Sequence, residues 1–169
     1  LVSIIIPTRD RWQLLQQCLR SIEEKTIYSR YEIIVLDNDS TDPETLAYLD
    51  AIAAKWRVYR YPGPFNFSEI NNFGAERASG DYFLFLNNDT QVISCDWLSA
   101  MLEHAQRREV GAVGAKLLYP VGRIQHAGVV IGIGGLAGHA FKGLPDSILS
   151  YYGFADLVRN CSAVTAACM

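Results

Sequence analysis

The sequence predicts an α/β fold, with a mostly parallel central sheet flanked by helices. Apolar runs suited to buried strands alternate with amphipathic helical patterns over most of the chain. Three of these apolar runs lead directly into clusters of polar residues suited to loops. The chain has 169 residues, 50% of them hydrophobic, which is enough for one domain with a substantial core. We expect a single domain over residues 1–169, with one half in 1–117 and the start of a second in 118–169.

The first elements are predicted by the period of their apolar residues. Val2–Ile6 is apolar except for one serine and is closed by a proline, which indicates a buried strand. Apolar residues from Trp12 to Ile22 recur at helical spacing, so residues 11 to about 25 are expected to form an amphipathic helix. Ile33–Leu36 is a second apolar run and predicts a second buried strand.

A strong helix start follows the second strand. Asp42 can cap a helix whose first residue is Pro43, and an acidic residue follows in the first turn. We expect the apolar face of this helix to be formed by Leu46, Leu49, Ala53 and Trp56. The short apolar run Val58–Tyr61 then predicts a third strand.

The next segment continues the alternation of helix and strand. Ser68 is the predicted cap of a helix that runs to about Ala78, with Gly80 as its stop. Tyr82–Leu86 predicts a fourth strand. A helix from about Asp96 to Arg107 and a strand near Val110–Leu117 are expected to follow. Trp12 and Trp56 lie on apolar helical faces, which favours core positions for both indoles.

The second half is rich in glycine and has no clear helical period before about Ser147, so we expect turns and hairpins there. Gly132–Ala137 matches the pattern GxGxx[GA] of dinucleotide-binding proteins, which makes an NAD-dependent oxidoreductase an alternative hypothesis. The fingerprint requires a helix after the glycines, however, and Gly138, Gly143 and Pro145 would break it. A loop or hairpin is the favoured interpretation.

Composition and charge exclude several classes of protein. The chain has 15 Lys and Arg against 18 Asp and Glu, so it lacks the concentrated positive charge that duplex nucleic acid requires. Its longest apolar runs are too short to cross a bilayer, and no signal-peptide pattern is visible. We therefore expect a soluble cytoplasmic protein, for which peripheral association with the inner face of the membrane stays open. Both ends fall within apolar segments, which indicates a fragment of a longer chain.

Cysteine and histidine show no metal-binding pattern. The four cysteines contain no CxxC pair, and we expect buried, reduced thiols. His126 and His139 flank the glycine-rich stretch and could contact an acceptor or a phosphate group. Ordinary surface or turn positions are the favoured interpretation for both.

Polar residues at three strand ends predict a ligand site. The clusters are Pro7–Asp10, Asp37–Ser40 and Asn87–Asp89. The carboxyl ends of parallel strands share one edge of a sheet, where ligands of open α/β sheets bind. Carboxylates in the first two clusters could accept hydrogen bonds from a base imide or a ribose hydroxyl, and Arg9 could place positive charge near phosphates. Asp89 suits Mg²⁺ or Mn²⁺ if a substrate diphosphate supplies further oxygen ligands.

These clusters lie within motifs that resemble family 2 glycosyltransferases. Val2–Asp10 and Ile34–Asp42 are similar to the first two signatures of that family, and Gly80–Thr90 is similar to its third, the strand with the metal-binding DXD-type motif. Ile124–Gly128 resembles members that build bacterial O-antigen and other surface polysaccharides. The resemblance implies a GT-A fold, which is Rossmann-like, an inverting mechanism, and a nucleotide-diphospho-sugar donor bridged by Mn²⁺ or Mg²⁺.

The resemblance also implies roles for individual residues. One group would line the nucleotide pocket, others would contact the base and ribose, and one would coordinate the metal. In that order they are Pro7, Thr8 and Asp10 for the pocket, Asp37 for uracil or another base with Asn38 nearby, Asn71 beside the nucleotide, Asn88 for the ribose, and Asp89 for the metal.

The sequence departs from the family pattern at two points. The DXD-type motif reads Asn87-Asn88-Asp89 and carries a single carboxylate. The aspartate that acts as catalytic base in the family has no match, and we expect it beyond Met169. Asp146 and Asp156 are weaker candidates, better explained as loop and helix-start residues.

The function expected from the resemblance is transfer of a sugar from a UDP- or dTDP-linked donor to a glycan or lipid-linked acceptor in surface polysaccharide synthesis. A nucleotide-binding fragment or an interaction module without turnover is the alternative.

Overall fold

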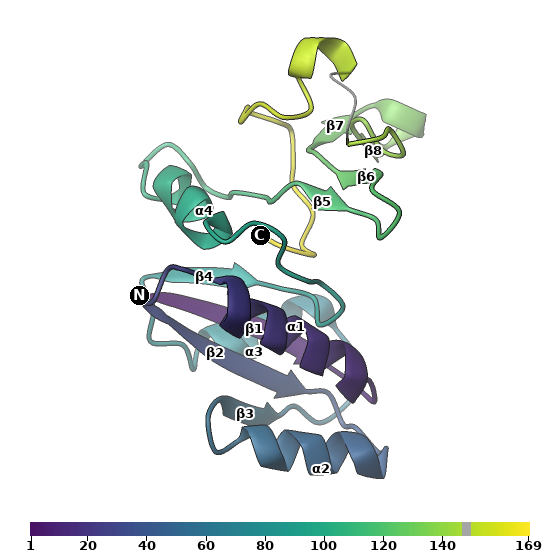
Figure 1. The fold of residues 1–169 in the computed structure, drawn as a ribbon. Coiled ribbons are helices and arrows are strands. Elements are labelled where there is room, and N and C mark those ends of the chain that lie inside the picture. The colour runs from purple at the N-terminus through teal and green to yellow at the C-terminus, as the bar shows by residue number, and fades with distance from the viewer. Residues whose placement is uncertain (147–149) are drawn as a thin grey trace. The chain divides into compact units, whose positions relative to one another are not determined.

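The computed structural model describes residues 1–146 and 150–169, which form two compact units, Leu1–Leu102 and Glu103–Met169. Figure 1 shows the ribbon of both units, coloured from the N-terminus to the C-terminus. The helical period expected from about Ser147 starts at residues outside the described part of the chain.

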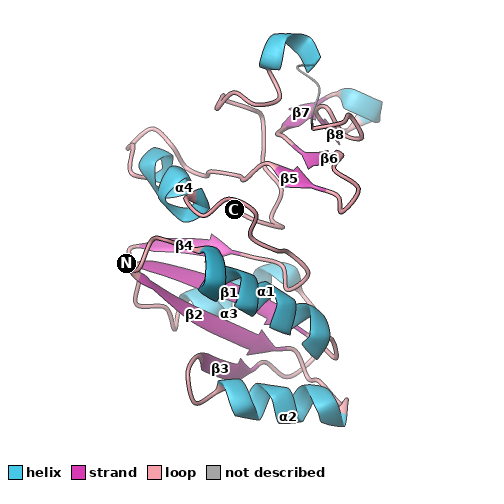
Figure 2. Cartoon of the chain, viewed as in Figure 1, coloured by secondary structure: helices cyan, strands magenta, loops and turns pink. Residues whose placement is uncertain are grey.

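The first unit alternates strands and helices, as the sequence predicts (Figure 2). Its parallel sheet has the strand order β3-β2-β1-β4. The elements are β1 (Val2–Thr8), α1 (Trp12–Lys25), β2 (Tyr31–Asp37), α2 (Pro43–Ile52), β3 (Arg57–Arg60), α3 (Phe67–Ala75), β4 (Tyr82–Phe85) and α4 (Trp97–Ala105), the last of which crosses into the second unit.

The two central strands are apolar because both of their faces are covered. Ile4, Ile5 and Ile6 of β1 and Ile34 of β2 are completely buried. Helix α1 lies on one face of the sheet and α3 on the other (Figure 1), where Ile70 of α3 packs with Ile5 and Ile34. This is the arrangement that near-continuous apolar runs indicate in a parallel sheet.

The strand order contains one reversal. The chain moves outward from β1 to β2 and β3, and then returns across the sheet to place β4 on the other side of β1. Right-handed crossovers therefore put the helix after β1 and the helix after β3 on opposite faces. The carboxyl ends of β1 and β4 flank this switch point, where ligands of open α/β sheets bind.

Two predicted helix boundaries are wrong. The cap of α3 is Asn66 rather than Ser68, because the Asn66 Oδ1 accepts hydrogen bonds from the backbone N–H groups of Ser68 at 3.1 Å and Glu69 at 3.3 Å. The helix ends at Ala75, before the predicted stop at Gly80. Gly80 instead donates its N–H to the Ser3 Oγ at 2.9 Å and has no room for a Cβ.

The start of α2 is confirmed, and its end is not. The Asp42 Oδ2 accepts the Thr45 N–H at 2.9 Å, and Pro43 is the first helical residue. The helix ends at Ile52, so Trp56 lies outside it. Trp12 and Trp56 are both half-buried, not core residues, because each indole N–H reaches a carboxylate at the surface, Glu44 and Glu23 respectively.

The second unit consists of short elements. They are β5 (Leu117–Leu118), β6 (Ile124–His126), β7 (Val129–Ile131), η1 (Ile133–Gly135), β8 (Ala137–His139) and η2 (Ser150–Gly153). Strands β5 and β6 form one antiparallel pair, and β7 and β8 form another.

The strand predicted near Val110–Leu117 is wrong, since only Leu117 belongs to a strand. Residues 110–116 include two glycines, which weaken a strand. This segment makes a different contact, in which the Ala115 N–H donates to the Cys168 carbonyl at 3.2 Å. At Gly114 a Cβ would lie 2.5 Å from the Cβ of Val164, so the backbones approach closely there.

The glycine-rich stretch forms the predicted hairpin. Gly132, Gly134 and Gly135 have positive φ angles of 98°, 66° and 90° and make the turn between β7 and β8. A dinucleotide fingerprint needs a strand that leads through the glycines into a helix. The antiparallel hairpin does not provide that unit, so the NAD-dependent oxidoreductase hypothesis is wrong.

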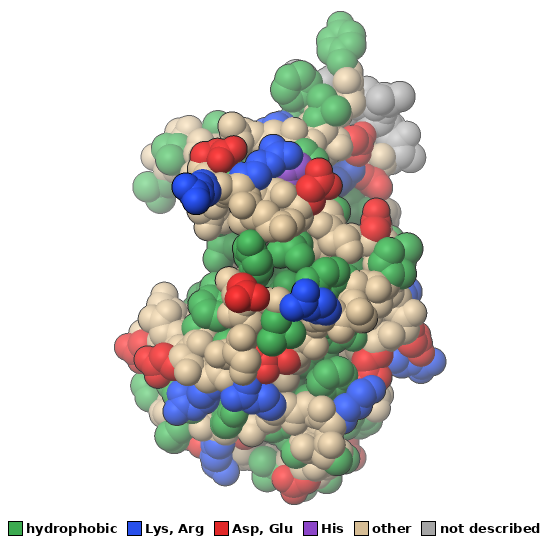
Figure 3. All heavy atoms as spheres, turned by 90° about the vertical axis from the view of Figure 1, so that its left-hand side faces the viewer, with side chains coloured by type: hydrophobic (Ala, Val, Ile, Leu, Met, Phe, Trp, Pro, Cys, Tyr) green, Lys and Arg blue, Asp and Glu red, His purple; other side chains and the backbone are tan. Residues whose placement is uncertain are grey.

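The surface charges, the lengths of the helices and the exposure of the cysteines can be compared with the sequence-based expectations. On the face that Figure 3 shows, basic and acidic side chains are interspersed. No helix in residues 1–146 or 150–169 combines the length and apolar character needed to span a bilayer. All four cysteines are free; Cys18 and Cys168 are buried as predicted, whereas Cys95 is exposed and Cys161 is half-buried.

Candidate functional site

The carboxyl ends of β1, β2 and β4 are joined at Thr8. This buried residue is the last of β1 and lies in register with Asp37, the last of β2. Its Oγ1 accepts a hydrogen bond from the Asn88 Nδ2 at 2.8 Å, and its carbonyl accepts the Asn38 N–H at 2.9 Å. The predicted convergence of the three polar loops on one edge of the sheet is therefore confirmed.

Asp10 holds the loop after β2 in place. Its Oδ1 accepts the backbone N–H groups of Thr41 at 2.7 Å and Asp42 at 2.8 Å, and its own N–H donates to the Ser40 Oγ at 3.0 Å. The N–H groups of Asp42 and Thr41 lower the pKa of the Asp10 carboxyl. Asp10 also has a left-handed φ of 47°, which is uncommon outside glycine. One of its oxygens is thus committed to the neighbouring loop.

Asp37 is buried and keeps one oxygen available. Its Oδ1 accepts the Ser40 N–H at 2.9 Å. Its Oδ2 makes no hydrogen bond to any residue that the structure describes. A carboxylate oxygen without a hydrogen bond, at a strand end, is suited to accept an N–H or O–H donor from a ligand.

Two buried carboxamides have an unsatisfied oxygen. The Asn38 Nδ2 donates to the carbonyls of Gly63 at 3.0 Å and Tyr61 at 3.3 Å, and the Asn71 Nδ2 donates to Phe67 at 2.8 Å. The Oδ1 atoms of Asn38 and Asn71 have no partner. An unpaired buried acceptor costs about 1–3 kcal/mol, so a donor from a bound ligand would stabilise both side chains.

Pro7 and Arg9 are the neighbours of Thr8 in the chain. Their contacts do not indicate a role in ligand binding for either residue. Pro7 is half-buried in β1 opposite Leu36. Arg9 is exposed, and its Nε lies 3.9 Å from the Asp10 Oδ2, at the limit of an ion pair.

Asp89 lies in a turn that is fixed to α1. The Thr90 Oγ1 donates to the Asn87 carbonyl at 2.8 Å and lies 3.7 Å from the Cys18 Sγ. Burial raises the pKa of the Cys18 thiol to about 11, so it stays protonated at neutral pH. The backbone of the turn is therefore held, while the Asp89 side chain is exposed and has no ion-pair partner among the described residues.

The donor set around Asp89 fits a divalent metal that shares its ligands with a substrate. One carboxylate and neighbouring amide oxygens are hard ligands of the kind that Mg²⁺ and Mn²⁺ prefer. Residues 1–146 and 150–169 contain no group of three His, Cys, Asp or Glu side chains that could enclose an ion. A metal at Asp89 would therefore depend on oxygens from the ligand.

Sequence reasoning included Asp39 in a polar cluster but missed its ion pair with Arg60 at this edge. Asp39 has a φ of 56°, and its Oδ1 pairs with the Arg60 Nη2 at 2.8 Å. Its Oδ2 accepts the Gly63 N–H at 3.1 Å. The Gly63 N–H and the Arg60 guanidinium lower the pKa of Asp39. The polar run after β2 includes Asp39, but its partner is set by the register of β3, which the sequence does not show.

The weaker candidates for a catalytic base are paired with a cation. Asp146 and Asp156 both contact the Lys116 ammonium. Partial burial opposes the charged form of Lys116, and the two carboxylates outweigh it and raise its pKa. Both carboxylates are therefore structural in this arrangement.

His126 is buried, so the expected surface or turn position is wrong for that residue.

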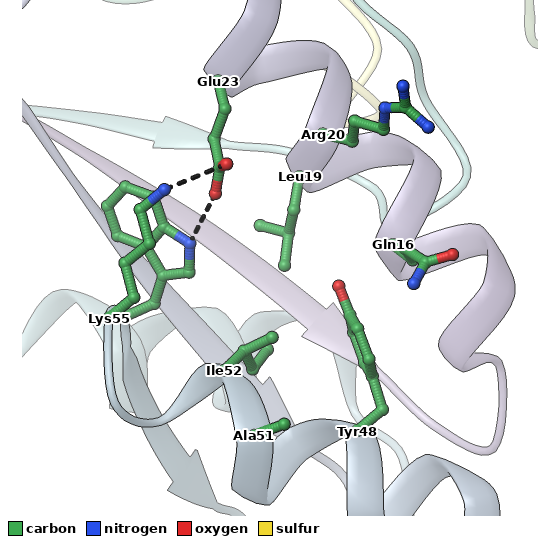
Figure 4. A pocket seen from close by; sticks show the side chains of 9 residues that line it. Gln16, Leu19, Arg20, Glu23, Tyr48, Ala51, Ile52 and Lys55 are labelled. Carbon is green, nitrogen blue, oxygen red and sulfur yellow. Dashed lines mark hydrogen bonds and ion pairs between the residues drawn. The ribbon is translucent and has the colours of Figure 1, made fainter.

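A pocket of about 220 Å³ between α1 and α2 is separate from this edge (Figure 4). Glu23 accepts the Trp56 Nε1 and pairs with the Lys55 Nζ, both at 3.0 Å, at its wall. None of the predicted site residues lines it.

Comparison with known proteins identifies the family of this chain. The pattern of glycosyl transferase family 2 matches residues 3–128. The O-antigen biosynthesis protein RfbC of Myxococcus xanthus is 45% identical over 99% of this chain, and the uncharacterized protein y4gI of Sinorhizobium fredii is 48% identical over 100% of it. The chain spans only 13% and 19% of these two relatives.

A solved structure shares the fold. The mannosyltransferase PcManGT from Pyrobaculum calidifontis, in complex with GDP-Man and Mn²⁺, superposes with a TM-score of 0.60 at 22% identity, over 69% of this chain and 35% of that one. The fold is thus the GT-A type of nucleotide-sugar transferases. The chain belongs to glycosyl transferase family 2.

Proposed function

We propose that this chain binds a nucleotide-diphospho-sugar, UDP- or dTDP-linked, together with Mn²⁺ or Mg²⁺, and that it is the donor-binding part of an inverting glycosyltransferase of surface polysaccharide synthesis. The observation that carries the proposal is the junction of the three polar loops at Thr8, at the switch point between β1 and β4. The similarity to RfbC supports the polysaccharide, and the fold shared with the GDP-Man and Mn²⁺ complex of PcManGT supports the donor class.

The base and ribose would be held by buried polar groups. The free Oδ2 of Asp37 accepts the base N–H, and the unsatisfied Oδ1 atoms of Asn38 and Asn71 take further donors of the nucleotide. Asn88, fixed by its hydrogen bond to Thr8, faces the ribose. Pro7 and Thr8 form the wall, and Asp10 keeps the loop of Asp37 in place.

The diphosphate would lie on the side of β4. Asp89 holds the metal, which when bound offsets the negative charge that develops on the departing diphosphate. Arg9 contributes positive charge near the phosphates, because its only ionic contact in the described chain is a long one.

Inversion requires a carboxylate that removes the proton of the acceptor hydroxyl. Asp146 and Asp156 are paired with Lys116, so we place this base outside residues 1–169. The acceptor is a glycan or a lipid-linked saccharide, and the proposed location is the cytoplasm or the inner face of the membrane.

Calorimetric titration tests donor binding. UDP, dTDP, GDP and NAD are titrated into the protein with Mn²⁺ and with EDTA. The proposal predicts Mn²⁺-dependent binding of UDP or dTDP and no binding of NAD. Binding of none of the nucleoside diphosphates would overturn it. Mn²⁺-dependent UDP binding without hydrolysis or transfer of a bound UDP-sugar would favour the alternative of a module without turnover.

A further inference from the structure

His126 is a buried residue with a fixed tautomer. It lies in β6 with 1% of its surface exposed. Its Nε2 accepts two backbone N–H groups, from Gly128 at 3.2 Å and Thr165 at 3.4 Å. An acceptor nitrogen carries no proton, so in the neutral ring the proton is on Nδ1.

This tautomer fixes that of His139. The two Nδ1 atoms are 2.8 Å apart, so His126 donates and His139 accepts. The proton of neutral His139 is therefore on its Nε2, and this half-buried ring presents an N–H donor that no residue in the described chain accepts. Burial, His139 and Arg159 all lower the pKa of His126, which favours the neutral form of that ring.

Arg159 adds an uncompensated positive charge beside the pair. Its Nη2 donates to the Ala127 carbonyl, and its guanidinium lies 5.1 Å from the centre of the Phe141 ring. Phe141 has a left-handed φ of 60°. Strained backbone of this kind persists only where the surroundings enforce it, and it clusters at ligand sites.

The carboxylates that form ion pairs in the described part of the second unit contact Lys116. In the described residues of the second unit, Lys116 pairs with both Asp146 and Asp156, and no carboxylate pairs with Arg159. Cys161 also lies close to the cluster, since its Sγ would be 3.3 Å from a Cβ at Gly128. Two histidine rings and a guanidinium thus offer donors and positive charge without an acidic partner.

We propose that His139 and Arg159 form a binding site for a phosphate or diphosphate group, with His126 as the positioning residue of His139. A guanidinium and an N–H donor of fixed direction are the groups that hold phosphate oxygens. The phosphate belongs either to a nucleotide-linked donor or to a phosphate-linked acceptor. The site uses neither Asp89 nor a metal, so it stands independently of the nucleotide site proposed above.

Titration with inorganic pyrophosphate in EDTA tests the site on the full chain. We expect binding that weakens about tenfold or more in Arg159→Gln and in His139→Gln, with no change in Arg108→Gln, an exposed arginine that serves as control. Partial recovery in Arg159→Lys would support a charge contact and would show that the variant folds. Absence of pyrophosphate binding, or equal weakening in Arg108→Gln, would overturn the site.

Nitrogen NMR of the histidine rings tests the positioning role. We expect a proton on Nδ1 of His126 and on Nε2 of His139, and a shift of the latter when pyrophosphate is added. In His126→Gln, His139 should become a mixture of tautomers, which loss of packing alone would not produce. A proton on Nε2 of His126 in the parent protein would contradict the proposal. Competition of pyrophosphate with UDP or with farnesyl diphosphate then distinguishes the two sources of phosphate.

Discussion

The Asn88 Nδ2 donates a hydrogen bond of 2.8 Å to the Thr8 Oγ1, across 80 residues of sequence. Thr8 ends β1, and Asn88 begins the turn that carries Asp89. This bond therefore sets the position of the proposed metal ligand relative to the proposed base pocket. It also lies at the reversal in strand order, which defines the ligand edge of the sheet.

Removing this bond should weaken nucleotide binding and folding by similar, small amounts. Thr8→Val keeps the shape of the side chain and leaves the Asn88 amide without its acceptor. One net hydrogen bond contributes about 1 kcal/mol, so we expect a loss of UDP–Mn²⁺ affinity of about fivefold and a similar small loss in stability. Calorimetry and urea unfolding measure the two effects. Ser29→Ala, which removes an exposed hydroxyl outside the three polar loops, is the control. Equal UDP affinity in Thr8→Val and the parent would show that this hydrogen bond does not support nucleotide binding.

Asp89→Ala should abolish the effect of Mn²⁺ on UDP binding. The side chain is exposed and makes no ion pair among the described residues, so we expect a change in unfolding free energy within about 0.5 kcal/mol. Asp50→Ala removes another exposed carboxylate, on α2, and should change neither quantity. Unchanged Mn²⁺-assisted affinity in Asp89→Ala would show that the metal is bound elsewhere.

Asp10→Asn should change the pH dependence of stability. Backbone N–H groups hold the pKa of Asp10 below its ordinary value of 3.8. A carboxyl with a depressed pKa stabilises the fold above its ordinary pKa, and this contribution is lost as the pH falls through the lowered value. Urea unfolding should show parent and variant separated by a constant difference above about pH 5, and by a shrinking one below about pH 4. A difference that is independent of pH down to about pH 2 would mean that the carboxylate charge does not matter.

Gly74→Ala should destabilise the sheet packing. A Cβ there would lie 2.7 Å from the Ile5 Cγ2 and 2.8 Å from the Leu36 Cδ1, both in fully buried side chains. Overpacking of this kind costs about 1–3 kcal/mol, which exceeds the gain of up to about 1 kcal/mol from higher helix propensity. Chemical unfolding measures the difference. Gly111→Ala, where a Cβ meets nothing, should be within about 0.5 kcal/mol of the parent, and a stable Gly74→Ala would contradict the close packing of α3.

The cysteines should differ widely in reactivity. Burial raises the pKa of Cys18 to about 11 and shields its sulfur, whereas Cys95 is exposed. Because the thiolate is the nucleophile, iodoacetamide should label Cys95 in the folded protein long before Cys18. Mass spectrometry of timed digests gives both rates. Rapid labelling of Cys18 would show that the contact between α1 and the Asp89 turn opens readily.

Local sequence patterns predicted most helices and strands of the first unit. They did not predict which residues contact one another in the folded chain. The buried strands and the start of α2 follow from apolar runs and from Asp42 with Pro43, signals contained within a few residues. The cap of α3 was misplaced because Asn66 and Ser68 are both good caps, and tertiary packing selects between them. The strand expected at Val110–Leu117 was wrong because the backbone at Gly114 and Ala115 lies against Val164 and Cys168 instead of pairing in the sheet.

The candidate site was predicted in outline. Polar residues at strand ends identify the edge of the sheet, but they do not show which side chains are committed to one another. Asp10 accepts the N–H groups of Thr41 and Asp42, which depends on the geometry of the loop. Asp39 pairs with Arg60, which depends on the register of the strands. The link between His126 and His139 depends on the pairing of β7 with β8, which a glycine-rich sequence specifies weakly.

A crystal structure of the protein with UDP and Mn²⁺ tests the central claim most directly. The account predicts the base beside Asp37, the ribose against Asn88 and the ion on the Asp89 carboxylate, at the edge where β1 and β4 end. UDP in the pocket between α1 and α2, or Mn²⁺ bound without Asp89, would contradict it.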